Sequence, residues 1–335
     1  MPSPEHQGSS LTTPKTQLPE ALCIGAIHWD TIAHAEQKVL RETSTPSKLK
    51  QKAGGVATNV ARALARLDVS VTLLGATGND PAAKAIEDQL QAESIKTCFS
   101  KRSSFATGQY LALHDPDGGL AAACVDDAVL RTAPFSTFDG LADKAPGAKL
   151  WFVDANLTEE HLEHVGAQAR DAKVRLIADG VSRAKVARLK RILKDIHLLV
   201  LNYDEAEALV GSFENTVSNR HPHGPRELLE ALGTLGANSI LITNGSKPVH
   251  GRQKFANGET ILFERTPPSA NIVDVTGAGD SLIAGTIASM LHQGLSAQSD
   301  KDLKAQLSYG LEAARLTLET TGAVSESLSF KLLFG

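Results

Sequence analysis

An α/β fold with a mostly parallel central sheet and helices on both faces is the architecture that this sequence predicts. Short apolar runs rich in β-branched residues alternate with stretches of helical periodicity along most of the chain. This alternation is typical of a parallel sheet covered by helices. Polar residues end several of these runs, and two segments interrupt the alternation.

The expected strands follow one another along the chain, at residues 22–27, 71–76, 150–154, 174–179, 197–202 and 239–243. The expected helices lie at residues 57–67, 80–92, 158–172, 184–194, 203–210, 225–235, 279–293 and 301–318. Ligands of parallel sheets bind at the carboxyl ends of the strands. We therefore expect the binding site at the edge that carries Asp154, Asp179, Asn202 and Asn244.

The two interrupting segments predict a small β-sheet lid. Residues 31–53 are polar, and residues 105–125 contain two extended runs separated by Asp115-Pro-Asp-Gly-Gly119, a strong hairpin turn. We expect both segments to belong to a single domain of residues 21–330. Residues 1–20 are rich in Ser, Thr, Pro and Gln and lack an apolar core, which predicts a disordered N-terminal tail.

Composition excludes several classes of function. The 335 residues carry a net charge of −4, and 42% of them are hydrophobic. This balance gives no electrostatic attraction to nucleic acid or to anionic membranes, and no apolar run is long enough to span a bilayer. The three cysteines are far apart and form no C-x-x-C pair, so a zinc site or disulfide framework is not expected. These features predict a cytoplasmic protein without a signal peptide.

The segment Asp274-Val-Thr-Gly-Ala-Gly-Asp-Ser281 carries the strongest functional signal. Its small residues Gly277, Ala278 and Gly279 precede Asp280 and a helical pattern, so free backbone N–H groups and the helix dipole favour an anion such as phosphate there. A carboxylate at this place suits a hydroxyl that must lose its proton to attack a phosphate. A plain strand-to-helix turn with an exposed acid is the alternative for a shorter motif.

This string resembles the C-terminal signature of the ribokinase-like (PfkB) family of sugar and nucleoside kinases. The resemblance implies a three-layer α/β/α ribokinase-like fold, ATP and Mg²⁺, and in some relatives a monovalent cation such as K⁺. It implies that Asp280 is the general base and that the amides of Gly277, Ala278 and Gly279 stabilise the transferred phosphoryl group, with Thr276 beside the nucleotide. It also implies a homodimer formed through the lid and a small-molecule substrate.

A second string, Gly54-Gly-Val-Ala-Thr-Asn-Val-Ala61, resembles the family's N-terminal signature. The resemblance assigns Gly54, Gly55 and Asn59 to the sugar, together with Asp30, which follows the first strand and whose carboxylate can accept hydrogen bonds from ribose hydroxyls. Paired glycines before a helix are common, so for this motif alone an ordinary helix start is an equally good interpretation.

Two further elements resemble the family's nucleotide contacts. Asn202-Tyr-Asp-Glu205 matches its N-x-x-E element, which implies that Asn202 and Glu205 organise Mg²⁺ mainly through water. Thr243-Asn-Gly245 resembles the T-x-G nucleotide contact and assigns Thr243 and Gly245 to ATP. An asparagine that caps a helix with acids in its first turn is the alternative for Asn202 and Glu205.

The substrate prediction depends on weaker strings. Residues 178–185 resemble the D-P-V-S-x-x-K segment of the pseudouridine kinase subgroup, and Asp126 lies in a lid segment that resembles the same subgroup, which assigns Asp126 and Lys185 to the substrate. Gly180 in place of Pro, and Asp127 in place of Met, depart from that pattern. An exposed helical lysine is the alternative for Lys185.

The predicted activity is ATP-dependent phosphorylation of the 5′-hydroxyl of pseudouridine. Ribokinase-, adenosine kinase- and fructokinase-like activities are alternatives with the same catalytic residues and a different lid. A non-catalytic nucleoside or sugar sensor is less favoured because Asp280 is present. A dinucleotide-dependent oxidoreductase is disfavoured because no G-x-G-x-x-G follows the first strand at Gly25.

Overall fold

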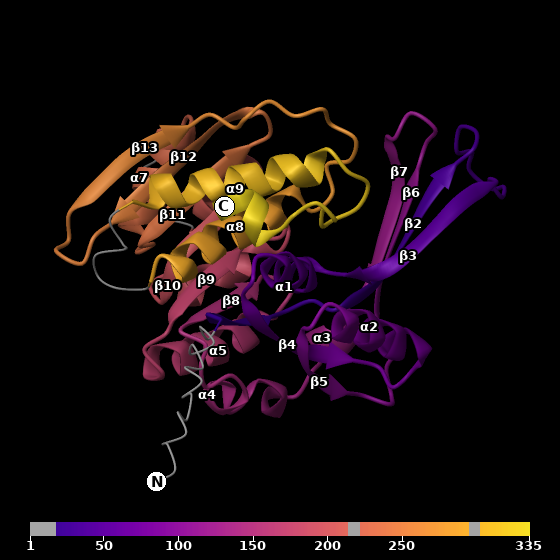
Figure 1. Ribbon diagram of the computed structural model, residues 1–335, viewed down its shortest axis with the longest axis horizontal. Helices are drawn as coiled ribbons and strands as arrows, with labels where there is room; N and C mark the ends of the chain where they lie inside the picture. The colour runs from indigo at the N-terminus through magenta and orange to yellow at the C-terminus, as the bar shows by residue number, and fades with distance from the viewer. Residues whose placement is uncertain (1–17, 214–221, 295–301) are drawn as a thin grey trace, which may run out of the picture.

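The computed structural model describes residues 18–213, 222–294 and 302–335, and these form a large and a small β-sheet (Figure 1). The large sheet has nine strands in the order β13-β12-β11-β10-β9-β8-β1-β4-β5. Their bounds are β1 Glu20–Ile24, β4 Ser70–Thr77, β5 Lys96–Lys101, β8 Leu150–Asp154, β9 Arg175–Asp179, β10 Ile196–Asn202, β11 Ser239–Asn244, β12 Lys247–Lys254 and β13 Thr260–Arg265.

Neighbouring strands from β11 to β5 are parallel, and only β12 and β13 pair antiparallel at one edge. The sheet strands send alternate side chains to opposite faces, as strands must. In β1, Ala21 and Cys23 enter one hydrophobic core while Leu22 and Ile24 enter the other. The predicted α/β class with a mostly parallel central sheet is therefore confirmed.

Helices cover both faces of the large sheet and complete three layers. One face packs against α1 (Val56–Arg66), α2 (Pro81–Ala92), α8 (Ala278–His292), α9 (Leu303–Leu318) and α10 (Phe330–Phe334). The other packs against α3 (Ala128–Arg131), η1 (Phe135–Phe138), α4 (Leu141–Lys144), α5 (Glu159–Asp171), η2 (Val186–Ile192), α6 (Tyr203–Gly211) and α7 (Pro225–Thr234). None of the helices in the described ranges is both long and apolar enough to cross a bilayer.

The small sheet projects from the body on the right of Figure 1. Its order is β3-β2-β6-β7, with bounds β2 His28–Ala35, β3 Ser47–Gly54, β6 Gly108–His114 and β7 Leu120–Asp126. The predicted hairpin joins β6 to β7, where Asp115 N–H donates to Gly119 O at 2.8 Å. Both interrupting segments therefore meet in one separate sheet.

Several sequence predictions differ from the structure. The expected helix at 184–194 is a 3₁₀ helix, and its buried residues Val186, Leu189 and Ile192 recur every three positions, which is the period of that helix. Strands β3 and β7 lie in the two segments expected to form the lid, although neither shows an alternating pattern because most of their side chains are exposed. Strands β5, β12 and β13 were not expected. Residues 1–17 of the predicted tail lie outside the described residues.

Candidate active site

The two glycine-rich motifs meet at the carboxyl edge of the large sheet. Asn59, in the first turn of α1, donates a hydrogen bond from Nδ2 to Oδ2 of Asp280 at 2.8 Å. Asp280 lies in the first turn of α8, 221 positions further along the chain. The fold therefore brings the predicted general base directly against the predicted sugar-binding helix.

Asp280 has the environment of a base that works near neutral pH. Its pKa is raised to about 7, mainly by removal from water and also by the charges of Asp154 and Asp30, against the hydrogen bond from Asn59, which lowers it. A general base is most effective when its pKa is close to the working pH. The side chain also keeps some contact with solvent, as a group that must meet a substrate requires.

The turn before α8 has a backbone that requires glycine. Gly277 caps the helix with a φ of 76°, in the left-handed region, and a Cβ there would lie 2.0 Å from Ala323 O. The amide of Ala278 donates to Val275 O at 3.4 Å, whereas within the described ranges the N–H groups of Gly277 and Gly279 show no hydrogen-bond acceptor. The amides of Gly277 and Gly279 are therefore available to bind an anion, whereas the amide of Ala278 stabilises the turn that contains it.

Asp274 anchors this turn. Its Oδ1 accepts from the N–H of Thr276 at 2.9 Å, and its Oδ2 accepts from the N–H of Gly322 at 3.0 Å. These bonds and the charge of Lys52 lower the pKa of Asp274 against desolvation, the largest influence, which raises it. Thr276 is exposed. The ionised carboxylate of Asp274 thus fixes the backbone of Thr276, the predicted nucleotide contact, in an exposed position.

Asp30 follows the first strand, as expected, and lies within β2 of the small sheet. The side chain is buried, its Oδ1 has no partner among the described residues, and burial raises its pKa to about 7 against the charges of Lys52 and Arg62. A Cβ at Gly54 would lie 1.9 Å from Oδ2 of Asp30. Gly54 therefore makes the space in which this carboxylate lies.

Gly55 joins β3 to α1. Its φ is 95°, and a Cβ there would lie 2.5 Å from Ala26 O. The second glycine of the pair thus lets the start of α1 approach the connection between β1 and β2. The four positions predicted to bind the sugar therefore lie on one side of Asp280: Asp30, Gly54, Gly55 and Asn59.

Asp154, at the end of β8, organises the site, although sequence analysis predicted no specific role for it. Its Oδ2 accepts from the N–H groups of Ala26 at 3.0 Å and Ala57 at 2.9 Å, and its Oδ1 from that of Asn156 at 3.0 Å. A side chain at Gly25 would meet this carboxyl group at 2.4 Å. One buried carboxylate therefore joins three segments around the substrate side of the site. A polar residue at the end of a buried strand was its only sequence signal.

The predicted metal and nucleotide residues lie on the other side of Asp280. Asn202 and Glu205 form a reciprocal capping box at the start of α6: Asn202 N–H donates to Oε2 of Glu205 at 3.0 Å, and Glu205 N–H donates to Oδ1 of Asn202 at 2.9 Å. Glu205 is buried, and burial raises its pKa. Gly245 turns the chain between β11 and β12 with a φ of 57°.

A cavity of about 190 Å³ connects these groups to the base. Its wall includes Asp179, Glu205, Thr243, Gly279 and Asp280. Desolvation, followed by the charges of Glu205 and Asp280, raises the pKa of Asp179 well above its ordinary value. Asp179 was expected only to end a strand, and the structure adds it to the site.

The acids of this cavity suit a hydrated divalent cation. In the described part of the chain, no three His, Cys, Asp or Glu residues are close enough to hold a metal ion together. Mg²⁺ commonly keeps several waters and uses one or two carboxylates with substrate phosphates. The negative charge of Glu205 raises the pKa of Asp179, and a bound divalent cation would reduce the repulsion between the two carboxylates.

The remaining predicted substrate residues lie at the foot of the small sheet. Lys185 is mostly buried rather than exposed, and its Nζ donates to Oδ1 of Asn156 at 2.6 Å and lies 3.4 Å from Oδ2 of Asp127. The exposed-lysine alternative is therefore wrong. Burial, followed by the charge of Lys185, lowers the pKa of nearby His28 to about 4. Asp126, at the end of β7, is exposed and accepts from Ala128 N–H at 3.2 Å.

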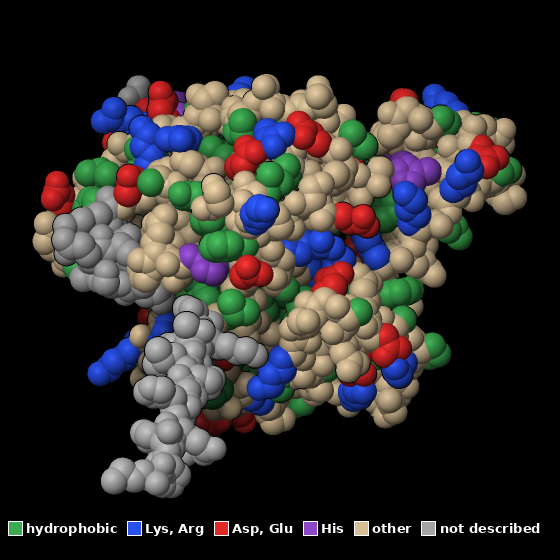
Figure 2. All heavy atoms as spheres, in the orientation of Figure 1, with side chains coloured by type: hydrophobic (Ala, Val, Ile, Leu, Met, Phe, Trp, Pro, Cys, Tyr) green, Lys and Arg blue, Asp and Glu red, His purple; other side chains and the backbone are tan. Residues whose placement is uncertain are grey.

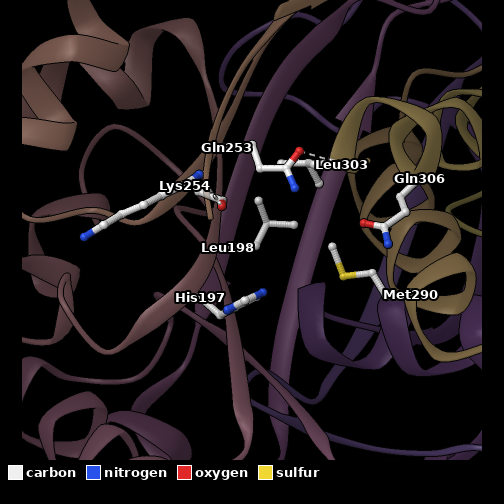
Figure 3. A pocket seen from close by; sticks show the side chains of 8 residues that line it. His197, Leu198, Gln253, Lys254, Met290, Leu303 and Gln306 are labelled. Atoms are coloured by element: carbon white, nitrogen blue, oxygen red, sulfur yellow. Dashed lines mark hydrogen bonds between the residues drawn. The ribbon is translucent and has the colours of Figure 1, made fainter. Parts of the chain in front are cut away.

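A separate hollow lies where β10 and β11 begin, at the opposite edge of the sheet. Figure 3 shows Leu198, Gln253 and Met290 around it. Its volume of about 20 Å³ has room for roughly one water molecule. It is too small to hold a substrate, and it lies at the strand ends opposite those that carry the candidate site.

Comparison with known proteins identifies relatives over nearly the whole chain. The uncharacterised sugar kinase YeiI of Escherichia coli is 27% identical over 277 residues, covering 82% of this chain and 74% of that protein. The pseudouridine kinase of E. coli is 27% identical over 264 residues, covering 78% and 80%. The adenosine kinase of Saccharomyces cerevisiae is 22% identical over 310 residues, covering 88% and 87%.

Solved structures show the same architecture. A carbohydrate kinase from Agrobacterium tumefaciens superposes with a TM-score of 0.77 at 25% identity, covering 94% of this chain and 97% of that one. The ribokinase of Arabidopsis thaliana complexed with ribose and ATP has a TM-score of 0.75 at 20% identity, covering 95% and 99%. The fold is therefore ribokinase-like, as the sequence predicted.

The family model for pfkB carbohydrate kinases matches residues 19–329, a span that includes both glycine-rich motifs and Asp280. Kinases of this kind use ATP as the phosphate donor and an alcohol group as the acceptor. By this match and by its fold, the chain belongs to the pfkB family of carbohydrate kinases.

Proposed function

We propose that the protein transfers the γ-phosphoryl group of ATP to the 5′-hydroxyl of pseudouridine. The hydrogen bond between Asn59 and Asp280 carries this proposal, because it joins a sugar-binding helix to a carboxylate whose pKa is about 7. The products are pseudouridine 5′-phosphate and ADP. Catalysis of this type depends mostly on positioning and on electrostatic stabilisation.

The transfer needs one base and one anion-binding surface. The 5′-oxygen attacks the γ-phosphorus, a new O–P bond forms, and the bond from that phosphorus to the β–γ bridging oxygen breaks, so that ADP leaves with the electron pair. Asp280 accepts the proton of the hydroxyl, a role typically worth about 10²–10⁴ in rate. The free N–H groups of Gly277 and Gly279 stabilise the charge on the transferred group, and one such donor is typically worth about 10²–10³.

The nucleotide and its metal belong on the side of Glu205. Thr243, Gly245 and Thr276 bind ATP in this proposal, and Asn202 and Glu205 hold Mg²⁺ mainly through water. When bound, Mg²⁺ neutralises phosphate charge. Asp179 adds a third acid to the same cavity wall. A K⁺ ion beside the Asp274 loop stays a family-based prediction.

The acceptor belongs on the side of Asp30. Its unpartnered Oδ1 and the amide of Asn59 can accept and donate bonds to vicinal ribose hydroxyls, with Gly54 and Gly55 giving close approach of the backbone. Lys185 and Asp126 are assigned to the rest of the nucleoside. The similarity to the E. coli pseudouridine kinase supports this choice, and the similarity to an adenosine kinase keeps other nucleosides and sugars as the alternative.

We also propose that the small sheet acts as a lid and as the contact of a homodimer. It displays exposed apolar side chains on both of its halves: Leu49, Leu111, Leu120 and Val125. An exposed sheet with apolar side chains is a surface that another copy can cover. Light scattering at micromolar concentration measures this directly, and a mass of one 35.5 kDa chain would contradict it.

The activity is tested by ADP release with Mg²⁺-ATP across pseudouridine, uridine, adenosine, ribose and fructose. We expect turnover mainly on pseudouridine and its loss in Asp280→Asn. Turnover mainly on another acceptor would overturn the substrate and keep the role of Asp280. A wild-type protein that binds one of these compounds, by thermal shift, without turning any over would be a sensor and not a kinase.

A further inference from the structure

Lys52 of β3 lies at the junction between the small sheet and the turn before α8. It stands directly opposite Asp30 in the antiparallel pairing of β2 with β3, so the two side chains share one face of the small sheet. At its other end, Nζ lies 2.7 Å from where a Cβ of Gly322 would be. The lysine therefore reaches from the acceptor side of the site to the segment that holds Asp274.

Among the described residues, the Lys52 ammonium has no counter-ion at bonding distance. Within the described ranges, it forms no ion pair and no hydrogen bond, although it is half-buried. Both carboxylate oxygens of Asp274 already accept backbone N–H groups, and Arg62 is paired with Glu93 through two bonds of 2.7 Å. A partly desolvated cation without a partner favours an incoming anion.

The other lysines of the strand provide the contrast. The side chains of Lys48 and Lys50 point to the same face of β3 as that of Lys52, because side chains alternate with a period of two. Both are exposed. Figure 2 shows basic and acidic side chains close together where the small sheet meets the body of the molecule. Only Lys52 of the three is enclosed, and it is the one beside Asp30 and Gly322.

The pKa of Lys52 depends on the same neighbouring groups. Desolvation, followed by the charge of Arg62, lowers its pKa, whereas Asp30 and Asp274 raise it. In turn, Lys52 lowers the pKa of Asp30, whose own burial raises it. Lys52 thus stands between the carboxylate proposed to hold the acceptor and the loop proposed to hold the phosphate.

We propose that Lys52 is a catalytic residue that binds the phosphoryl group during its transfer from ATP to the acceptor. This rests on the proposed phosphoryl transfer, and it adds a cation from the small sheet to the amides of Gly277 and Gly279. In the transition state, the transferred phosphoryl group carries negative charge on its three equatorial oxygens. A fixed cation beside it stabilises that charge.

The kinetic test compares Lys52→Met with Lys52→Arg and with Lys48→Met as the matched control. We expect kcat to fall about 10²-fold in Lys52→Met with a smaller change in KM, since the contact strengthens during transfer. Lys52→Arg restores most of kcat because it restores the charge. Lys48→Met removes an equal charge from the same strand and keeps kcat within about twofold of wild type.

A binding test separates Lys52 from the choice of acceptor. Calorimetry with Mg²⁺-AMP-PNP and Mg²⁺-ADP measures the phosphate contact without turnover. We expect Lys52→Met to weaken AMP-PNP about tenfold more than ADP. If wild type phosphorylates no acceptor and this selectivity is present, the proposed function fails and the role of Lys52 stands. The retained affinity for ADP shows that the variant is folded.

Two results would overturn the assignment. One is a Lys52→Met protein with kcat and AMP-PNP affinity within about threefold of wild type. The other concerns a phosphate already present on the acceptor, tested with fructose 6-phosphate and ribose 5-phosphate. If wild type uses one of these and Lys52→Met raises its KM with kcat unchanged, Lys52 reads a substrate phosphate and not the transferred one.

Discussion

Asn59 and Asp280 share a hydrogen bond of 2.8 Å between the first turns of two helices that are far apart in the sequence. The amide donates, so the bond favours the ionised form of the carboxylate and lowers its pKa against the effect of desolvation. The helix that is proposed to hold the sugar therefore also sets the basicity of the group that deprotonates it.

Replacing Asn59 with Ala should raise the pKa of Asp280. A hydrogen bond to a charged group is typically worth about 1.5–3 kcal/mol, which corresponds to a shift of about one pH unit or more in the acidic limb of kcat/KM. The pH–rate profile measures this shift. Asn238→Ala is the control, because Asn238 donates only to backbone carbonyls at the far edge of the sheet and should leave the limb in place.

The activity of the wild type should fall steeply below neutral pH. The pKa values of Asp280 and Asp30 are both raised to about 7, and both groups act as carboxylates in the proposed mechanism. As pH falls through about 7, both become protonated, so the slope of log kcat/KM should approach two. In Asp30→Asn the slope should approach one with lower activity. A slope of one in the wild type would remove Asp30 from the ionised pair.

The two glycines around Ala278 should respond in opposite ways to a methyl group. Gly277→Ala forces a Cβ against Ala323 O in a left-handed conformation, so we expect lower stability and kcat reduced at least about 10²-fold. Gly279 is in a helix with open space beside it, so Gly279→Ala should raise stability by about 0.5–1 kcal/mol. Its methyl group enters the space proposed for the phosphates, so KM for ATP should rise. Thermal unfolding and ATP titrations measure both effects.

Asp154→Ala should lower both the stability of the fold and the affinity for the acceptor. The change leaves three buried N–H groups without an acceptor, and each costs about 1–3 kcal/mol. Asp154→Asn keeps acceptor oxygen and should be milder, with KM for the acceptor raised more than KM for ATP because Ala57 begins the helix that carries Asn59. Urea unfolding gives the stability. Equal rises of both KM values would argue against a role confined to the acceptor side.

The sequence predicted the class of the fold, the strands around the site and the edge on which it lies. These follow from local patterns: buried strands are short apolar runs, and a glycine-rich turn before a helix is visible as letters. The approach of Asn59 to Asp280 was implied only through family resemblance, since no local pattern encodes a contact between distant helices.

Three features could not be predicted for physical reasons. Strand β3 buries only its last residues, Ala53 and Gly54, and has no alternating signal, so its segment was predicted only as part of the lid. The 3₁₀ helix at Val186–Ile192 has apolar residues every third position, a period close enough to that of an α-helix to mislead. Asp154 acts through backbone N–H groups of other segments, which carry no side-chain signature. The dimer, the cytoplasmic location and the K⁺ site stay predictions.

The short connection between β1 and β2 has a further consequence. Only three residues separate Ile24 in the large sheet from His28 in the small sheet, and Asp154 accepts a hydrogen bond from Ala26 in that connection. Asp30 and Lys52 belong to the small sheet, while Asp280 belongs to the body. Under the proposed mechanism, a complete reaction centre exists only when both parts grip the same acceptor. We therefore expect such an enzyme to hydrolyse little ATP while its nucleoside is scarce.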